Sequence, residues 1–197
     1  IMFNLIWSTH ENKIRMTLTG VRLSVAFTVG ILMVSQSAIA ADKKPFGGPD
    51  SVQFAKKLWT ALEQAKLVGK KQLRVKPYEG NEPHGFVLES IDSSITLDGR
   101  EARVVVKRNY GPEGVEVEAV EANRAKHLAA VTVMFKREKG YDSDNLDWFW
   151  AKYKADGSID KNPKGMNLVG RVAKGADVGC IACHKGAPGD DMVFVFD

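Results

Sequence analysis

Cysteine is scarce in this chain of 197 residues: only two are present, which excludes a framework of several disulfides. An excess of one charge is also missing, because 28 lysine and arginine residues face 24 aspartate and glutamate residues. The resulting net charge of +4 gives no case for nucleic-acid binding, and we expect none. With 7 prolines, 18 glycines and 9% aromatic residues, the chain is neither collagen-like nor disordered. An ordinary globular composition remains.

A long hydrophobic run is absent as well. The most apolar stretch, Val21 to Val34, is shorter than the roughly 20 residues that a membrane span needs. Arg22 stands near its start and Ala38-Ile39-Ala40 follows it, which is typical of a secretory signal peptide. We expect a secreted protein cleaved after Ala40, with no stable membrane span; an uncleaved anchor is the alternative. The chain then divides into an over-extended translation start at residues 1–15, a signal peptide at residues 16–40 and a single domain at residues 41–197.

Apolar residues at helical spacing predict a helix at the start of this domain. They form one stripe, made of Ala55, Leu58, Trp59, Leu62 and Ala65. Asp50 or Ser51 is a suitable N-cap, and Gly69 is a suitable end.

Beyond residue 84 the pattern changes to the period of two that is typical of strands. The candidate strands are residues 86–91, 103–110, 115–118, 128–135 and 148–153. Short turns between them, such as Asp98-Gly99, favour antiparallel pairing. We therefore expect an α+β fold that is mostly β, with the helix followed by a curved antiparallel sheet of about five strands. Residues 167–176 suggest a short helical stretch, and residues 192–196 a closing apolar strand.

The C-terminal segment contains Cys180-Ile-Ala-Cys183-His184, the attachment signature of c-type haem. Two thiols at this spacing can each form a thioether with one haem vinyl group, and the next residue is carried under the iron as an axial ligand. We expect one covalent haem c on Cys180 and Cys183, with His184 bound to its iron. The alternatives are a zinc site completed by His84 and His127, a thioredoxin-like redox pair, and a strained disulfide.

A second iron ligand cannot be recognised in the sequence. Few residues follow His184, and the methionines of the domain have no identifying spacing. We therefore expect five-coordinate iron with an open sixth position. His84 and His127 are candidates for the distal side or for the haem propionates, although surface or structural roles are commoner for such residues.

Three segments, CIACHKGAPGDDMVF, DWFWAKY and RVVVKRNY, resemble the cytochrome P-460 family, which includes the β-type cytochromes c′. The resemblance runs from about His84 to the C-terminus. It implies a small periplasmic monohaem protein on a mostly antiparallel sheet, often a homodimer, with five-coordinate iron. It also implies that Lys107 touches the haem or is bonded to it; the alternative is an exposed strand lysine.

The resemblance implies a redox enzyme that oxidises a small nitrogen compound, hydroxylamine or nitric oxide, and passes electrons to a periplasmic acceptor. Two other functions stay open. One is a non-catalytic protein that binds nitric oxide or carbon monoxide, as the β-type cytochromes c′ do. The other is a simple electron-transfer cytochrome with a filled sixth position.

Overall fold

A computed structural model describes residues 46–194. The expected translation start, the signal peptide and its cleavage site after Ala40 lie outside these residues. Within residues 46–194, none of the helices has the length and apolar character that crossing a bilayer requires. The helices are α1 (Pro49–Gln64), α2 (Val117–Ala122), α3 (Arg124–His127), the 3-10 turn η1 (Ser143–Asn145) and α4 (Cys180–His184).

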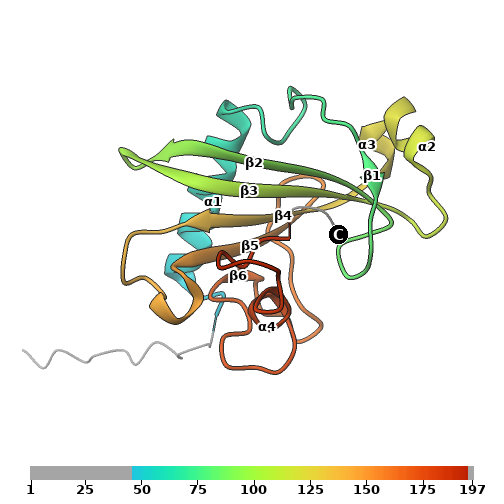
Figure 1. Cartoon of the computed structure of the whole chain (residues 1–197). Coiled ribbons are helices and arrows are strands. Elements are labelled where there is room, and N and C mark those ends of the chain that lie inside the picture. Colours follow the sequence, from blue (N-terminus) through green and yellow to red (C-terminus); the bar gives the residue numbers. More distant parts are fainter. Residues whose placement is uncertain (1–45, 195–197) are drawn as a thin grey trace, which may run out of the picture. The chain divides into compact units, whose positions relative to one another are not determined.

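Six antiparallel strands form one sheet in which neighbours in the chain are neighbours in the sheet (Figure 1). The strands are β1 (Tyr78–Glu79), β2 (Val87–Leu97), β3 (Arg100–Tyr110), β4 (Leu128–Lys136), β5 (Trp148–Lys154) and β6 (Val169–Gly170). Asp98 and Gly99 join β2 to β3 with φ values of 50° and 78°, which is the left-handed geometry of tight hairpin turns. The expected α+β fold, mostly β, is confirmed, and the strand number is six.

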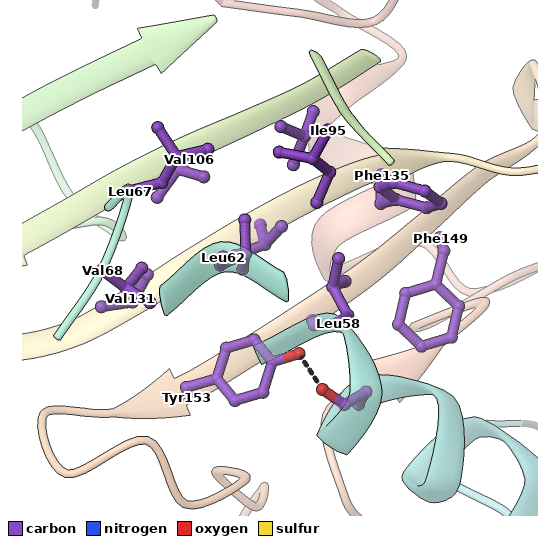
Figure 2. Packing of buried hydrophobic residues seen from close by; sticks show 14 of the residues in the cluster. Leu58, Leu62, Leu67, Val68, Ile95, Val106, Val131, Phe135, Phe149 and Tyr153 are labelled. Atoms are coloured by element: carbon purple, nitrogen blue, oxygen red, sulfur yellow. Dashed lines mark hydrogen bonds between the residues drawn. The ribbon is translucent and has the colours of Figure 1, made fainter. Parts of the chain in front are cut away.

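One face of the sheet packs against α1. Leu58 and Leu62 point from the helix toward the strands (Figure 2) and are fully buried. Alternate side chains of the strands pack against the helix. They include Val104, Val106, Val131, Val133, Phe135, Phe149, Ala151 and Tyr153. The Tyr153 hydroxyl also donates a hydrogen bond of 2.8 Å to the Ala55 carbonyl. This helix-on-sheet layer is the main hydrophobic core.

The intervening residues of the same strands face a second, smaller cluster. Val105, Met134, Trp148 and Trp150 pack there against residues that follow β6, among them Ile181 of α4. Because successive side chains of a strand point to opposite faces, a single stretch such as Trp148–Tyr153 serves both clusters. The sheet thus separates the main core from the C-terminal segment.

The segment predicted as a strand at residues 115–118 is not a strand, because α2 starts at Val117. Four alternating residues are too few to exclude a helix. Val117 and Val120 are three positions apart, so one face of α2 can pack both residues beside Val87 and Tyr110. The short edge strands β1 and β6 complete the sheet.

Four other local expectations were wrong. The N-cap of α1 is Gly48, with no side-chain hydrogen bond; Pro49 begins the helix, a position where its missing N–H costs nothing. The helix ends at Gln64, well before Gly69. Residues 167–176 are not helical, because β6 pairs with β5 and turns follow it. Residues 192–194 are not a strand.

Candidate haem-binding site

The single turn of α4 carries the three residues of the attachment motif. Cys180 and Cys183 are free thiols, one half-buried and the other exposed, while His184 is buried. Residues three apart in a helix are neighbours on its surface, so the two cysteines lie on the same face of α4. Gly179 precedes it at φ 118°, where a Cβ would come within 2.5 Å of the Ala173 methyl carbon. Burial raises the pKa of the Cys180 thiol.

The imidazole of His184 is held in one orientation. Its Nδ1 lies 2.8 Å from the carbonyl oxygen of Met192, an acceptor, so Nδ1 carries the proton and donates it. This leaves Nε2 as the nitrogen with a lone pair, the usual arrangement of a metal-binding histidine. The rings of Trp150 and Phe194 lie against this imidazole, with centroid distances of 4.7 and 5.3 Å. The protein's own contacts therefore orient the side chain that the sequence predicts as the axial ligand.

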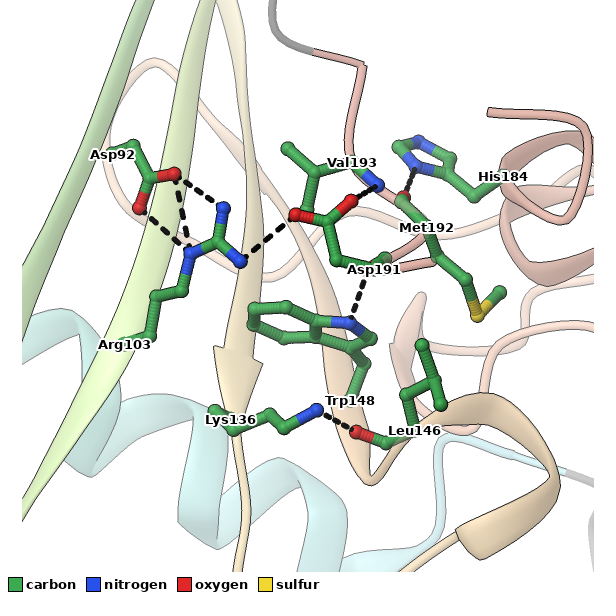
Figure 3. Close-up of polar contacts among 9 residues, drawn as sticks. All are labelled: Asp92, Arg103, Lys136, Leu146, Trp148, His184, Asp191, Met192 and Val193. Carbon is green, nitrogen blue, oxygen red and sulfur yellow. Dashed lines mark hydrogen bonds and ion pairs between the residues drawn. The ribbon is translucent and has the colours of Figure 1, made fainter. Parts of the chain in front are cut away.

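The segment that holds His184 is itself fixed to the sheet (Figure 3). Arg103 Nη1 of β3 binds Asp191 at 2.9 Å, and the same guanidinium pairs with Asp92 of β2. The Asp191 carboxylate accepts the Val193 N–H at 3.0 Å, and its carbonyl accepts the Trp148 indole N–H at 2.8 Å. We call Arg103, Asp191 and Trp148 the latch. It places the Met192 carbonyl under His184.

A cavity of about 340 Å³ opens between α4 and the second face of the sheet. Its walls include Val105, Lys107, Thr132, Met134, Trp150 and Lys152 from the strands, and Cys180, Cys183 and His184 from α4. Lys107 is only 4% exposed, so it is not a surface lysine. It pairs in register with Ser90 on β2 and Thr132 on β4, at the centre of the sheet.

His84, a candidate for the distal side or the propionates, and Thr132, which the sequence did not single out, reach the cavity together. His84, on the turn before β2, lines it, and His84 Nδ1 lies 3.2 Å from Thr132 Oγ1. Thr132 and Met134 follow the period of β4, which is the signal that could have found them. His127 is on α3 and does not line the cavity. Of the aromatic residues on β5, Trp150 lines it, whereas Phe149 and Tyr153 belong to the main core.

These residues fit a covalently attached haem. The cavity lies within the range of about 300–1,000 Å³ that cofactor pockets occupy. Two thiols and an oriented imidazole share one wall of it, and most of the rest is apolar. In the part of the chain that the structure describes, no group of three or more histidine, cysteine or acidic side chains could hold a metal ion. The zinc alternative therefore has no support among these residues, and the two thiols are not joined as a disulfide.

Comparison with known proteins gave one family. The model of the family described as cytochrome P460 matches residues 98–195, from the β2–β3 turn through α4. The matched span contains Lys107 and the complete attachment motif. Searches of curated proteins and of solved structures returned no match. Residues 98–195 are therefore a domain of the cytochrome P460 family.

Proposed function

We propose that this protein is a c-type monohaem protein that oxidises a small nitrogen compound, hydroxylamine or nitric oxide. The observation that carries the proposal is the convergence of two thiols, an oriented imidazole and a buried lysine on one cavity. A haem supplies redox-active iron when it is bound there. Family membership supports the haem.

The residues of the chain have separate tasks in this proposal. Cys180 and Cys183 hold the haem through thioethers, and His184 presents Nε2 to the iron. The latch keeps the imidazole from rotating, because it fixes the carbonyl that accepts the Nδ1 proton. The mostly apolar walls make the cavity a favourable place for the apolar face of a haem. Lys152, which is paired with Asp160 at 3.2 Å, places a cation at the cavity wall and can neutralise a haem propionate.

Lys107 has the most specific task. It lies within β3, lines the cavity and is only 4% exposed. We propose that Lys107 Nζ lies against the macrocycle and is bonded to it. Forming that bond replaces one N–H and one C–H by a C–N bond, and needs a two-electron oxidant such as hydrogen peroxide, which is reduced to two waters. Without the bond, binding of nitric oxide or carbon monoxide becomes the favoured function.

We further propose that the protein works in the periplasm, with its signal removed after Ala40, and passes its electrons to a periplasmic acceptor. A homodimer is the expected assembly. Sequencing the N-terminus of the exported protein and measuring its mass in solution test these two points. An intact leader or a monomer would contradict them.

Haem attachment is tested on a denaturing gel stained for haem, because thioethers survive unfolding. We expect the wild-type chain to stain and a Cys180→Ser, Cys183→Ser chain not to stain. His184→Ala should keep the covalent haem while its spectrum loses the proximal histidine. His127→Ala, which alters a histidine outside the cavity, is the control and should match the wild type. Haem that is lost on acid–acetone extraction of the wild type would refute attachment.

The lysine bond is tested by mass mapping of haem peptides and by the reduced absorption spectrum. In the wild type we expect a haem that joins the Cys180–His184 peptide to the peptide containing Lys107, and a strongly red-shifted Soret band. Lys107→Arg should abolish both, whereas Lys154→Arg, at an exposed lysine of β5, should abolish neither. Identical spectra for wild type and Lys107→Arg, with haem on the cysteine peptide alone, would show that there is no bond.

A further inference from the structure

The backbone of Met192 is in a conformation that few side chains adopt. Its φ is 62°, in the left-handed region where a Cβ is crowded and where glycine or asparagine is usual. The residue is also buried, as a member of the second, smaller cluster. A left-handed conformation of this kind costs free energy and persists only where the surrounding structure holds it. The contacts around Met192 therefore have to supply that hold.

Both neighbours of Met192 are anchored (Figure 3). Before it, the Asp191 carboxylate binds Arg103 Nη1 at 2.9 Å, and the Asp191 carbonyl accepts the Trp148 indole N–H at 2.8 Å. After it, the Val193 N–H donates to the same carboxylate at 3.0 Å. One carboxylate thus binds the chain on both sides of Met192, and Arg103 holds that carboxylate against the sheet.

The strained residue presents its carbonyl to the imidazole of the attachment motif. Met192 O accepts the Nδ1 proton of His184 at 2.8 Å. The backbone dihedrals of Met192 decide where this carbonyl points, so a return to an ordinary negative φ would turn the acceptor away from the ring. A continuous set of contacts therefore runs from Arg103 on β3, through Asp191 and Met192, to His184 on α4.

We propose that Arg103 is a positioning residue that sets the reduction potential of the haem iron by holding Met192 in its left-handed conformation. This inference rests on the haem site of the proposed function. A hydrogen bond donated by the second ring nitrogen makes an iron-bound histidine more basic, and a more basic ligand stabilises ferric iron. Without Arg103, Met192 relaxes, the hydrogen bond of His184 weakens and the potential rises.

The direction of this change separates positioning from simple electrostatics. Ferric iron carries one more positive charge than ferrous iron, so removal of the Arg103 cation would by itself stabilise the ferric state and lower the potential. Loss of the hydrogen bond acts in the opposite direction. The side chains of Arg103 and Asp191 are 37% and 43% exposed, so their ion pair contributes little to the free energy of unfolding. The effect on the iron can therefore be measured in a folded protein.

The test uses the full exported chain with its covalent haem. It measures the reduction potential and, by resonance Raman spectroscopy, the iron–histidine stretching frequency of the ferrous protein. In Arg103→Gln we expect a higher potential and a lower frequency than in the wild type. Arg103→Lys keeps the cation and should lie between the two. Lys57→Ala, which breaks the exposed ion pair with Asp98, is the control and should change neither quantity.

Variants of Met192 test the strained conformation itself. Glycine adopts a φ near 62° without crowding, so Met192→Gly should keep the wild-type frequency. In that background Arg103→Gln should shift the frequency less than it does in the wild type. A β-branched residue is poorly tolerated at positive φ, so Met192→Ile should lower the frequency as Arg103→Gln does.

Three results would overturn the inference: a lower potential in Arg103→Gln, an iron–histidine frequency that does not change in this variant, or an equally large shift in the Met192→Gly background. Each is measured on a chain that stains for haem on the denaturing gel. Failure of the proposed function is distinct, because the wild-type chain would then retain no haem on that gel.

Discussion

Glu89 shows what a single residue contributes to this sheet. Its carboxylate is fully buried on β2 and accepts hydrogen bonds from Arg108, Tyr110 and Arg124 at 2.6–2.7 Å. A buried charge is unfavourable unless it is paired and hydrogen-bonded. Burial, followed by the hydrogen bond to Glu89, raises the pKa of Tyr110, so this hydroxyl keeps its proton and remains a donor. Glu89 thereby ties β2 and β3 to α3.

Glu89→Gln should lower the free energy of unfolding by about 3–5 kcal/mol, because it leaves the buried guanidinium of Arg108 without a counter-charge. Urea denaturation measures the change. Asp98→Asn is the matched control: it breaks the exposed ion pair with Lys57 and should change stability by less than about 1 kcal/mol. Equal effects of the two substitutions would show that burial does not decide the strength of these pairs.

The latch makes stability depend on acid through Asp191. Partial burial opposes the shift, but the N–H of Val193 and the guanidinium of Arg103 hold the pKa of Asp191 below its usual value. A carboxylate with a lowered pKa in the folded state stabilises the fold above its unfolded pKa, about 3.9. This contribution is lost as the pH falls through the folded pKa.

The difference in unfolding free energy between the wild type and Asp191→Asn should therefore be constant from pH 7 to pH 5 and shrink below about pH 4. The side chain is 43% exposed, so we expect a difference of under about 1 kcal/mol even at neutral pH. Denaturant titrations of both chains at pH 6 and pH 3 measure it. A difference that grows toward acid pH would contradict the direction of the shift.

At the scale of elements, α1 stabilises the sheet without approaching the haem site. Its buried residues all contact the main core, and none lines the cavity. A helix of this length is only marginal in isolation, so its apolar face against the strands supplies most of its stability.

Leu58→Ala should therefore destabilise the protein by about 2–5 kcal/mol, the usual cost of emptying a fully buried leucine site. The haem spectrum should not change. Lys56→Ala, on the exposed side of the same helix, should have little effect on stability and serves as the control. Thermal unfolding followed by circular dichroism measures both. A shifted haem spectrum in Leu58→Ala would show that the two faces of the sheet are coupled.

The elements also show what the sequence could predict. β4 and β5 lie where their β-forming residues indicated, because central strands are long and strongly patterned. β1 and β6 have two residues each and exist through pairing with a neighbour, so no local pattern could reveal them. In the site, spacing alone identified Cys180, Cys183 and His184. The sequence offered both His84 and His127 for the distal side or the propionates and could not decide between them, because only the fold brings the turn that carries His84 to the cavity.

At the scale of the whole molecule, the sheet separates the main hydrophobic core from the cavity proposed to hold the haem. The main core lies between α1 and one face, and the cavity lies between α4 and the other face. The largest cluster of apolar contacts is thus complete without a haem.

The Cys180→Ser, Cys183→Ser chain, which cannot hold haem covalently, should therefore keep its sheet and unfold cooperatively at a lower temperature than the wild type. Amide hydrogen exchange should show protected β4 and β5 in both chains, with protection lost only around α4 and the Asp191–Val193 segment. A chain without a cooperative transition would mean that the haem is needed to form the core.

The alternation of β3, β4 and β5 also constrains how this protein can diverge. Substitutions at Lys107, Thr132 or Trp150 alter the cavity and leave the neighbouring core residues in place. The loss or gain of one residue within these strands instead shifts every following side chain of the strand to the opposite face of the sheet. Core residues would then face the cavity, and a lysine would be buried in the main core. Descendants of this chain should therefore keep the fold when residue types on the cavity face change, while insertions and deletions accumulate only in the connecting loops.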